Sequence, residues 1–363
     1  AHPGSPARIL APEKAGGAHD LAEWVAAAPA DAGLEGPRLP FLLKLLAAAA
    51  PLSLQAHPSL EQARAGFERE NAAGVPIDAS HRNYKDAFHK PELVVALSET
   101  YSALCGFRAV AETRALLATV NDGDPALEAL ASSLGEGSEP DDEVLRRTVR
   151  DLLTDRLGDV VPALVSAAGA ALAGDSLDAA EATVLRSIAD LADAYPGDPG
   201  VAVAVLLNRV TLARGEALYL PAGNIHAYLE GLGVELMASS DNVLRGGLTP
   251  KHVDVDELLD VLDFRPLPVP VLHPVARGAG VEAFTPDVPD FELLRVDPVA
   301  AADTPIELPG PAIAIVTAGT AVLSDGTDIA LPVGAAAYIV PAAQPLRVSG
   351  DGELFIATTH LDR

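Results

Sequence analysis

The stretch Gly215-Glu-Ala-Leu-Tyr-Leu-Pro221-Ala-Gly223-Asn-Ile-His226 decides how this chain folds. A glycine opens a short apolar run that predicts a strand over 217–220, and Pro221 with Gly223 predicts a tight turn after it. The turn can aim His226 into the mouth of a barrel. Imidazole is a preferred ligand of zinc and related metals, but a single histidine after a turn is more often structural.

A second segment, Gln55-Ala56-His57, carries residues that can share a metal ion with His226. The pattern predicts a strand over 52–57, and side chains two positions apart on a strand point to the same face. Gln55 and His57 can therefore reach one ion. An edge strand with polar residues on its wet face is the alternative, but the apolar residues before Gln55 and the proline after His57 do not suggest an exposed strand.

The third segment is His89-Lys90-Pro91-Glu92. Pro91 favours an extended local chain, and Glu92 can add a carboxylate oxygen to the same ion. The three segments together would give a mixed nitrogen and oxygen site that keeps room for water or substrate. Their convergence is an assumption, because they are far apart in the chain.

The fourth segment runs from Ser240 to Lys251 and contains Arg245 beside two glycines. Such an arginine can approach a phosphate or sugar oxygen closely. The formal net charge of −26 makes each cation near a candidate site informative, because an anionic substrate needs a local basic pocket. The alternative is a surface arginine paired with Asp241.

The composition excludes several classes of protein. A net charge of −26 over 363 residues repels phosphate backbones, so nucleic acid is not an expected partner. The single cysteine, Cys105, permits no disulfide within the chain, which fits a reducing cytoplasm. No apolar run reaches about 18 residues and no basic and then apolar leader is found, so we expect a cytoplasmic protein without a membrane partner. The chain has no initiator methionine, and we expect it to begin inside a longer protein.

The pattern of the chain changes twice. Apolar residues from about 107 to 195 recur with helical spacing, as in Leu145, Val149 and Leu152, which predicts a set of helices. After the turn-forming residues 196–200 the pattern predicts strands, over 201–209, 217–220 and 233–238, and then a helix over about 254–262. The last hundred residues predict short strands at barrel-like intervals, over 312–316, 320–324, 335–340 and 353–357.

These segments match a known family. Gly215 to His226 resembles the second cupin motif, G-x5-P-x-G-x2-H, with Glu230 in place of its usual asparagine. Gln55-Ala56-His57 stands where cupins usually have His-x-His, and this variant resembles the type I mannose-6-phosphate isomerases. The resemblance extends in order over nearly the whole chain, through residues 51–58, 83–86, 89–92, 104–108, 224–228 and 240–251.

The resemblance implies a mainly β fold with a helical insertion. It consists of two cupin domains, which are jelly-roll β-barrels, plus an α-helical domain. We expect the catalytic cupin in residues 1–106 and 197–265, the helical domain in 107–196, and a second cupin in 266–363. The family usually begins with further residues, so we expect the first strands of the catalytic barrel to be missing. The second cupin has no histidine in the position of His226, and we expect no metal there.

The resemblance also implies the residues of the site. One zinc ion per chain would be held by Gln55, His57, Glu92 and His226. The substrate pocket would contain Lys90, Glu235, Asp241 and Arg245, with His89 on the same loop as Lys90, and these five are the catalytic candidates. Lys44 and Ser53 fall at family positions near the sugar phosphate, which Arg245 would also bind.

The implied activity is the interconversion of mannose 6-phosphate and fructose 6-phosphate. A proton must leave C2 and return to C1 through an enediol, which requires a base and a stabiliser for the developing oxyanion. Zinc would serve as the Lewis acid, and Arg245 and Lys90 would add positive charge. The base stays open among Glu235, Asp241, His89 and a zinc-bound hydroxide.

Two alternatives come from other classes of function. A metal-dependent cupin of other chemistry, such as an iron dioxygenase, would favour two histidines and one carboxylate with open positions. Gln55 as a fourth ligand and the basic residues argue against it. A non-catalytic sugar-binding cupin would need neither the metal nor a cationic pocket of phosphate size. The expected partner is a small sugar phosphate, and the expected state is a monomer.

Overall fold

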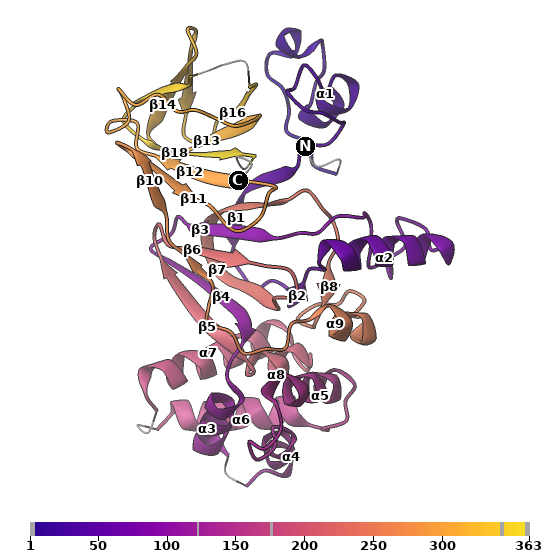
Figure 1. The fold of residues 1–363 in the computed structure, drawn as a ribbon. Coiled ribbons are helices and arrows are strands. Elements are labelled where there is room, and N and C mark those ends of the chain that lie inside the picture. The colour runs from indigo at the N-terminus through magenta and orange to yellow at the C-terminus, as the bar shows by residue number, and fades with distance from the viewer. Residues whose placement is uncertain (1–3, 122, 175–176, 342–344, 360–363) are drawn as a thin grey trace.

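A computed structural model describes residues 4–121, 123–174, 177–341 and 345–359 of the chain (Figure 1). These residues form three parts along one long axis, with helices at one end, a curled antiparallel sheet in the middle and two smaller sheets at the other end (Figure 1). The fold is therefore a mixture of helix and sheet. Within the described ranges, no helix combines the length and the apolar character that crossing a membrane requires.

Nine strands form the central sheet. They are β1 (Phe41–Ala48), β2 (Gln55–Ala56), β3 (Glu92–Ala96), β4 (Thr100–Phe107), β5 (Leu207–Ala213), β6 (Ala217–Leu220), β7 (His226–Ala238), β8 (Leu244–Arg245) and β9 (Val271–Leu272). The main path has the order β5-β4-β7-β3-β6-β9, while β1 pairs with β7, and β2 pairs with both β7 and β8. The start of β7 pairs with β2 and β4 and its later part with β1 and β3, so this one strand joins both parts of the curled sheet.

The register of these strands places three charged residues, Lys44, Glu92 and Glu235, on one face of the sheet. Lys44 is opposite Glu235 on β7, and Glu92 is opposite Met237. Residues directly opposite in a sheet share a face, as do residues two apart on one strand. Lys44, Glu92 and Glu235 therefore point to the same side, where the carboxylates of Glu92 and Glu235 are buried.

The predicted turn before His226 is present. β6 covers Ala217–Leu220 as predicted, and Gly223 has a φ of 78°, in the left-handed region where glycine carries no steric penalty. The N–H of Gly223 donates to the His57 carbonyl at 2.9 Å, so the turn brings the chain before His226 against the chain at His57. The strand predicted over 52–57 is much shorter, because only Gln55–Ala56 enters the sheet.

A group of helices covers one end of the sheet (Figure 1). They are α3 (Val110–Val120), α4 (Pro125–Ser133), α5 (Asp141–Leu153), α6 (Val160–Leu172) and α7 (Ala179–Ala194). The predicted helical face is confirmed, since Leu145, Val149 and Leu152 are buried together on α5. These helices share one core cluster with residues of the sheet, including Leu104 and Phe107 of β4.

The prediction of a strand over 201–209 is wrong for its first half. Gly200–Ala204 is a short helix, α8, and β5 begins only at Leu207. Every residue from Val201 to Leu207 is buried, and a short, wholly apolar run has no periodicity that separates strand from helix. The Asp198 carboxylate accepts the Gly200 N–H at 2.7 Å at the start of the helical turn.

The remaining helices lie outside this group. They are a 3-10 helix (Pro12–Ala15), α1 (Leu21–Ala27), α2 (Leu60–Ala72) and α9 (Val255–Val261). A capping box at Ser59 and Gln62 starts α2, and the Asp254 side chain caps α9, which lies within the predicted range 254–262. Trp24 of α1 packs edge-on against Tyr338, with 5.2 Å between ring centroids, so the N-terminal segment rests on the C-terminal sheets.

The C-terminal sheets have six and three strands. The six are β10 (Val275–Gly278), β11 (Val281–Phe284), β12 (Glu292–Val296), β18 (Glu353–Thr358), β13 (Ala312–Ala318) and β16 (Ala336–Ile339), and the three are β15 (Asp328–Pro332), β14 (Thr320–Ser324) and β17 (Arg347–Gly350). The four strands predicted here are confirmed to within two residues. One core cluster fills the space between the two sheets, and another, with Phe41, Leu236 and Phe355, joins them to the central sheet.

Candidate metal centre

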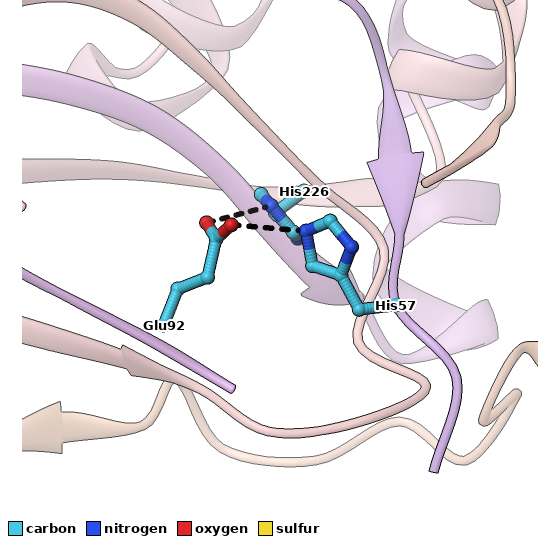
Figure 2. A group of neighbouring side chains, drawn as sticks. All are labelled: His57, Glu92 and His226. Atoms are coloured by element: carbon cyan, nitrogen blue, oxygen red, sulfur yellow. Dashed lines mark ion pairs between the residues drawn. The ribbon is translucent and has the colours of Figure 1, made fainter. Parts of the chain in front are cut away.

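Three buried side chains from three strands or strand ends converge inside the central sheet. His57 follows β2, Glu92 opens β3 and His226 opens β7. Figure 2 shows both imidazole rings turned toward the Glu92 carboxylate. Each residue offers one ligand atom, and these atoms lie within 4.8 Å of one another. The convergence that the sequence could only assume is present for these three residues.

The main chain fixes the tautomer of both histidines. His57 Nδ1 lies 2.8 Å from the Asn242 carbonyl oxygen, and His226 Nδ1 lies 3.1 Å from the Asn224 carbonyl oxygen. Because a carbonyl can only accept a hydrogen bond, each Nδ1 must be the donor, and each neutral ring then carries its lone pair on Nε2. This is the arrangement by which proteins usually orient a metal-binding histidine.

In these tautomers the Nε2 atoms face the Glu92 carboxylate as acceptors. His57 Nε2 lies 3.1 Å from Glu92 Oε1, and His226 Nε2 lies 3.5 Å from Glu92 Oε2 (Figure 2). Both Nε2 atoms are buried and neither has a hydrogen-bond partner within the described ranges. Three acceptors that face one another in a dry site repel, and a cation among them removes the repulsion. Two imidazoles and a carboxylate are a donor set that suits zinc.

The ionisation states favour metal binding as well. Burial, with the nearby Lys90 charge, lowers the pKa of His57 to about 4, so this imidazole stays neutral near neutral pH. Burial opposes ionisation of Glu92, but the charge of Lys90 beside it holds its pKa well below the usual value. Neutral imidazole and ionised carboxylate are the forms that bind metal ions.

Two lysines accompany the buried carboxylates. Lys90 Nζ lies 2.9 Å from Glu92 Oε1, and its pKa is raised because Glu92 and its acidic neighbours outweigh the effect of burial. Lys44 Nζ lies 3.5 Å from Glu235 Oε2. Burial, together with repulsion from Glu92, raises the pKa of Glu235 to about 7. The site therefore contains a carboxyl group that titrates near neutral pH.

Gln55 and Arg245 lie beside His226 in the sheet. Gln55 is opposite His226 of β7 on one side and opposite Arg245 of β8 on the other. Residues directly opposite share a face, so the three side chains point the same way. Arg245 is half-buried, and its side chain makes no hydrogen bond or ion pair with any other residue that the structure describes. The predicted alternative, an arginine paired with Asp241, is not what the structure shows.

The other predicted residues lie further from the three ligand atoms or have other partners. His89 Nε2 pairs with Asp290 of the C-terminal part at 2.8 Å. Asp241 is exposed, its N–H donates to the Asp86 carboxylate at 2.8 Å, and its charge contributes to the raised pKa of Lys90. Ser53 is half-buried on the irregular segment before β2.

Asp198 is a residue of this region that sequence reasoning missed. One carboxylate oxygen accepts the N–H groups of Gly200 and Leu248 at 2.7 and 2.8 Å, and the other accepts the Thr249 N–H at 3.1 Å. Leu248 has a φ of 55°, an unusual conformation for a leucine, and it directly follows the glycines after Arg245. Asp198 thus clamps the loop that follows Arg245. In the sequence, Asp198 stands between two Pro-Gly pairs, a pattern that predicts only a loop.

Comparisons with known proteins give one consistent result. A family model described as phosphomannose isomerase type I, catalytic domain, matches residues 1–110. The chain is 39% identical over 319 residues to mannose-6-phosphate isomerase of Escherichia coli strain K12, covering 87% of this chain and 78% of that protein. It is 34% identical over 378 residues to mannose-6-phosphate isomerase of Rattus norvegicus, covering 98% and 82%. A crystal structure of mannose 6-phosphate isomerase bound with zinc and yttrium matches with a TM-score of 0.84 and 35% identity, covering 99% of this chain and 90% of that chain.

Proposed function

Since the chain belongs to the type I mannose-6-phosphate isomerase family, we propose that His57, Glu92 and His226 hold its zinc ion and that Gln55 is the fourth ligand. The enzyme is a zinc-dependent aldose–ketose isomerase that interconverts mannose 6-phosphate and fructose 6-phosphate. The observation that carries the residue assignment is the pair of partnerless Nε2 atoms that face the Glu92 carboxylate.

Gln55 is the proposed fourth ligand because of its place in the sheet. It shares a face with His226, which lies directly opposite on the neighbouring strand. A glutamine oxygen would add a neutral donor to the two nitrogens and the carboxylate. Arg245, on the other side of Gln55, then lies at the edge of the centre, where its charge can act on a substrate oxygen.

Zinc bound here supplies a Lewis acid for the carbonyl and hydroxyl oxygens of the open-chain sugar. The guanidinium of Arg245 binds a substrate oxygen and stabilises the negative charge that develops in the enediol step. Lys90 is buried against Glu92 and keeps this carboxylate ionised. Lys44, whose side chain is 47% exposed, and Ser53 are the residues that we assign to the phosphate end of the substrate.

Glu235 is the base that we favour among the candidates. It is buried on the same face as Glu92, and its pKa of about 7 lets it take a proton from carbon and return it near neutral pH. His89 is a weaker candidate because Asp290 holds its Nε2. Asp241 is exposed, so its surroundings do not favour proton transfer from carbon.

The proposal extends to the domain organisation. A catalytic cupin would comprise residues 1–106 and 197–265, a helical domain 107–196 and a metal-free cupin 266–363. The separate core between the two C-terminal sheets supports a second barrel. We further propose that the enzyme acts as a cytoplasmic monomer on a small sugar phosphate.

A metal analysis combined with a coupled assay for mannose 6-phosphate tests this function. We expect zinc near one per chain, activity that disappears with a chelator, and recovery with zinc. Zinc without isomerase activity would contradict the assigned reaction and favour another cupin chemistry. Sugar binding without metal and without turnover would favour a non-catalytic cupin.

A further inference from the structure

Asn242 is a fully buried residue between β7 and β8 whose side chain holds the loop over residues 85–88. Its amide oxygen accepts the N–H groups of Lys85 and Asp86, at 2.7 and 3.2 Å. Its amide nitrogen donates to the carbonyl oxygens of Asp86 and Phe88, at 2.8 and 2.9 Å. These four bonds use both donors and both acceptor positions of the carboxamide, so no other side chain of similar size can replace all of them.

The main chain of the same residue contacts a metal ligand. The Asn242 carbonyl oxygen accepts the hydrogen bond from His57 Nδ1 at 2.8 Å. The loop that the side chain holds leads within a few residues to Lys90 and Glu92. One buried residue therefore joins the segment that orients His57 to the segment that carries Glu92.

We propose that Asn242 is a positioning residue for the zinc centre, and that its carboxamide sets the distance between His57 and Glu92. The inference rests on the proposed ligands, and it adds a residue that touches neither zinc nor substrate. A side-chain amide that is fixed by four bonds also fixes its own main-chain carbonyl, and that carbonyl determines the orientation of the His57 ring. Metal-binding histidines depend on such partners for ring orientation and basicity.

The two obvious substitutions disturb this link differently. In Asn242→Ala, two N–H groups and two carbonyl oxygens of the loop lose their buried partners. In Asn242→Asp, the two acceptor contacts with Lys85 and Asp86 persist, but an oxygen replaces the donor that faces the carbonyls of Asp86 and Phe88. A buried carboxylate there is also repelled by the Asp86 side chain, which lies 3.2 Å from the present nitrogen.

The test is the zinc affinity of the apo-protein, measured by competition with a chromophoric chelator. We expect both variants to bind zinc about 10- to 100-fold more weakly than wild type, as loss of a partner of a metal-binding histidine usually does. The visible spectrum of the cobalt-substituted protein should change too, because it reports ligand geometry. The matched control is Asn83→Ala, which removes a tether of the chain just before this loop, the 2.9 Å bond to Asp254, and should leave affinity and spectrum unchanged.

The result that overturns the proposal is a folded Asn242→Asp or Asn242→Ala protein with wild-type zinc affinity and cobalt spectrum. If the alanine variant does not fold, the aspartate variant decides, because it keeps the shape and two of the four bonds. A double-mutant cycle adds a second readout: in a His57→Ala background, substitution of Asn242 should change the residual affinity much less. A wild-type protein that binds no zinc would contradict the metal centre itself, a different outcome.

Discussion

His57 Nε2 lies 3.1 Å from Glu92 Oε1 in a position where neither atom carries a proton. The ring's other nitrogen is committed as a donor to a main-chain carbonyl, so Nε2 and the carboxylate meet as two acceptors. Both side chains are almost completely buried, and solvent cannot relieve the repulsion. The folded chain thus holds an arrangement that a cation would stabilise, and we expect metal binding to stabilise the fold.

Removal of zinc should therefore lower thermal stability. With free zinc at 100 times its dissociation constant, the metal contributes about 2.7 kcal/mol to the free energy of unfolding. We expect the midpoint of unfolding, followed by circular dichroism, to fall after dialysis against a chelator and to recover with zinc. The same treatment should not affect a His226→Ala protein, and equal shifts in both would contradict this link.

His226→Ala should lose both zinc and activity. The substitution removes one of the two imidazole nitrogens and leaves Glu92 with a single histidine partner. Zinc content after dialysis and the rate of mannose 6-phosphate turnover are the measurements. The control is His273→Ala, since His273 is exposed in the C-terminal part and should be dispensable. Full zinc content and rate in the His226→Ala protein would show that the ligand assignment is wrong.

Arg245→Ala should reduce turnover while zinc stays bound. Its guanidinium has no partner within the described ranges, so the folded protein loses little when it is removed, whereas a developing oxyanion loses a preorganised charge. We expect kcat/KM to fall about 10²- to 10³-fold. Arg265→Ala, which breaks only an exposed pair with Asp263, is the control. A near-normal rate in Arg245→Ala would remove this residue from the substrate pocket.

The pH dependence of the isomerase rate should reveal the ionisation of Glu235. Its pKa is raised to about 7, so the carboxylate that can accept a proton predominates only above that value. The rate should rise with pH through about 7 and fall as the group is protonated below it. Glu235→Gln should lose about 10²- to 10⁴-fold in kcat and should no longer show this acid limb, with zinc retained. If the variant keeps the wild-type pH profile, another group causes the loss of rate at low pH and acts as the base.

Asp198→Ala should loosen the loop after Arg245. The buried Leu248 and the half-buried Thr249 would lose the acceptor for their N–H groups, at a cost of about 1–3 kcal/mol. We expect KM to rise and kcat to fall, with zinc content unchanged, and Asp198→Asn to show a smaller effect. Asp193→Ala, at an exposed position on α7, is the matched control. Equal kinetics in the two alanine variants would mean that the clamp does not position Arg245.

Local sequence patterns predicted the turn before His226, the strand over 217–220, the amphipathic face of α5 and the C-terminal strands. These features depend on residues close together in the chain, such as Pro221 and Gly223 in the turn or Leu145 and Val149 on one helix face. The wrong prediction of a strand at the start of 201–209 has the same origin. An apolar run that is buried throughout contains no polar residue from which a helical or strand periodicity can be read. The partial strand at 52–57 shows that a strand's length depends on its partners, β7 and β8, which lie far along the chain.

The sequence by itself determined which residues are chemically able to bind zinc and a sugar phosphate, because residue type fixes the available nitrogen and oxygen donors. Only the tertiary structure decided which of them meet. His57, Glu92 and His226 come together because β7 pairs with strands from both parts of the central sheet. The carbonyls of Asn224 and Asn242 then select the tautomer, and main-chain carbonyls leave no trace in residue identity. Asp198 and the Asn242 side chain likewise bind mainly to backbone groups, so their positions exist only in the folded chain.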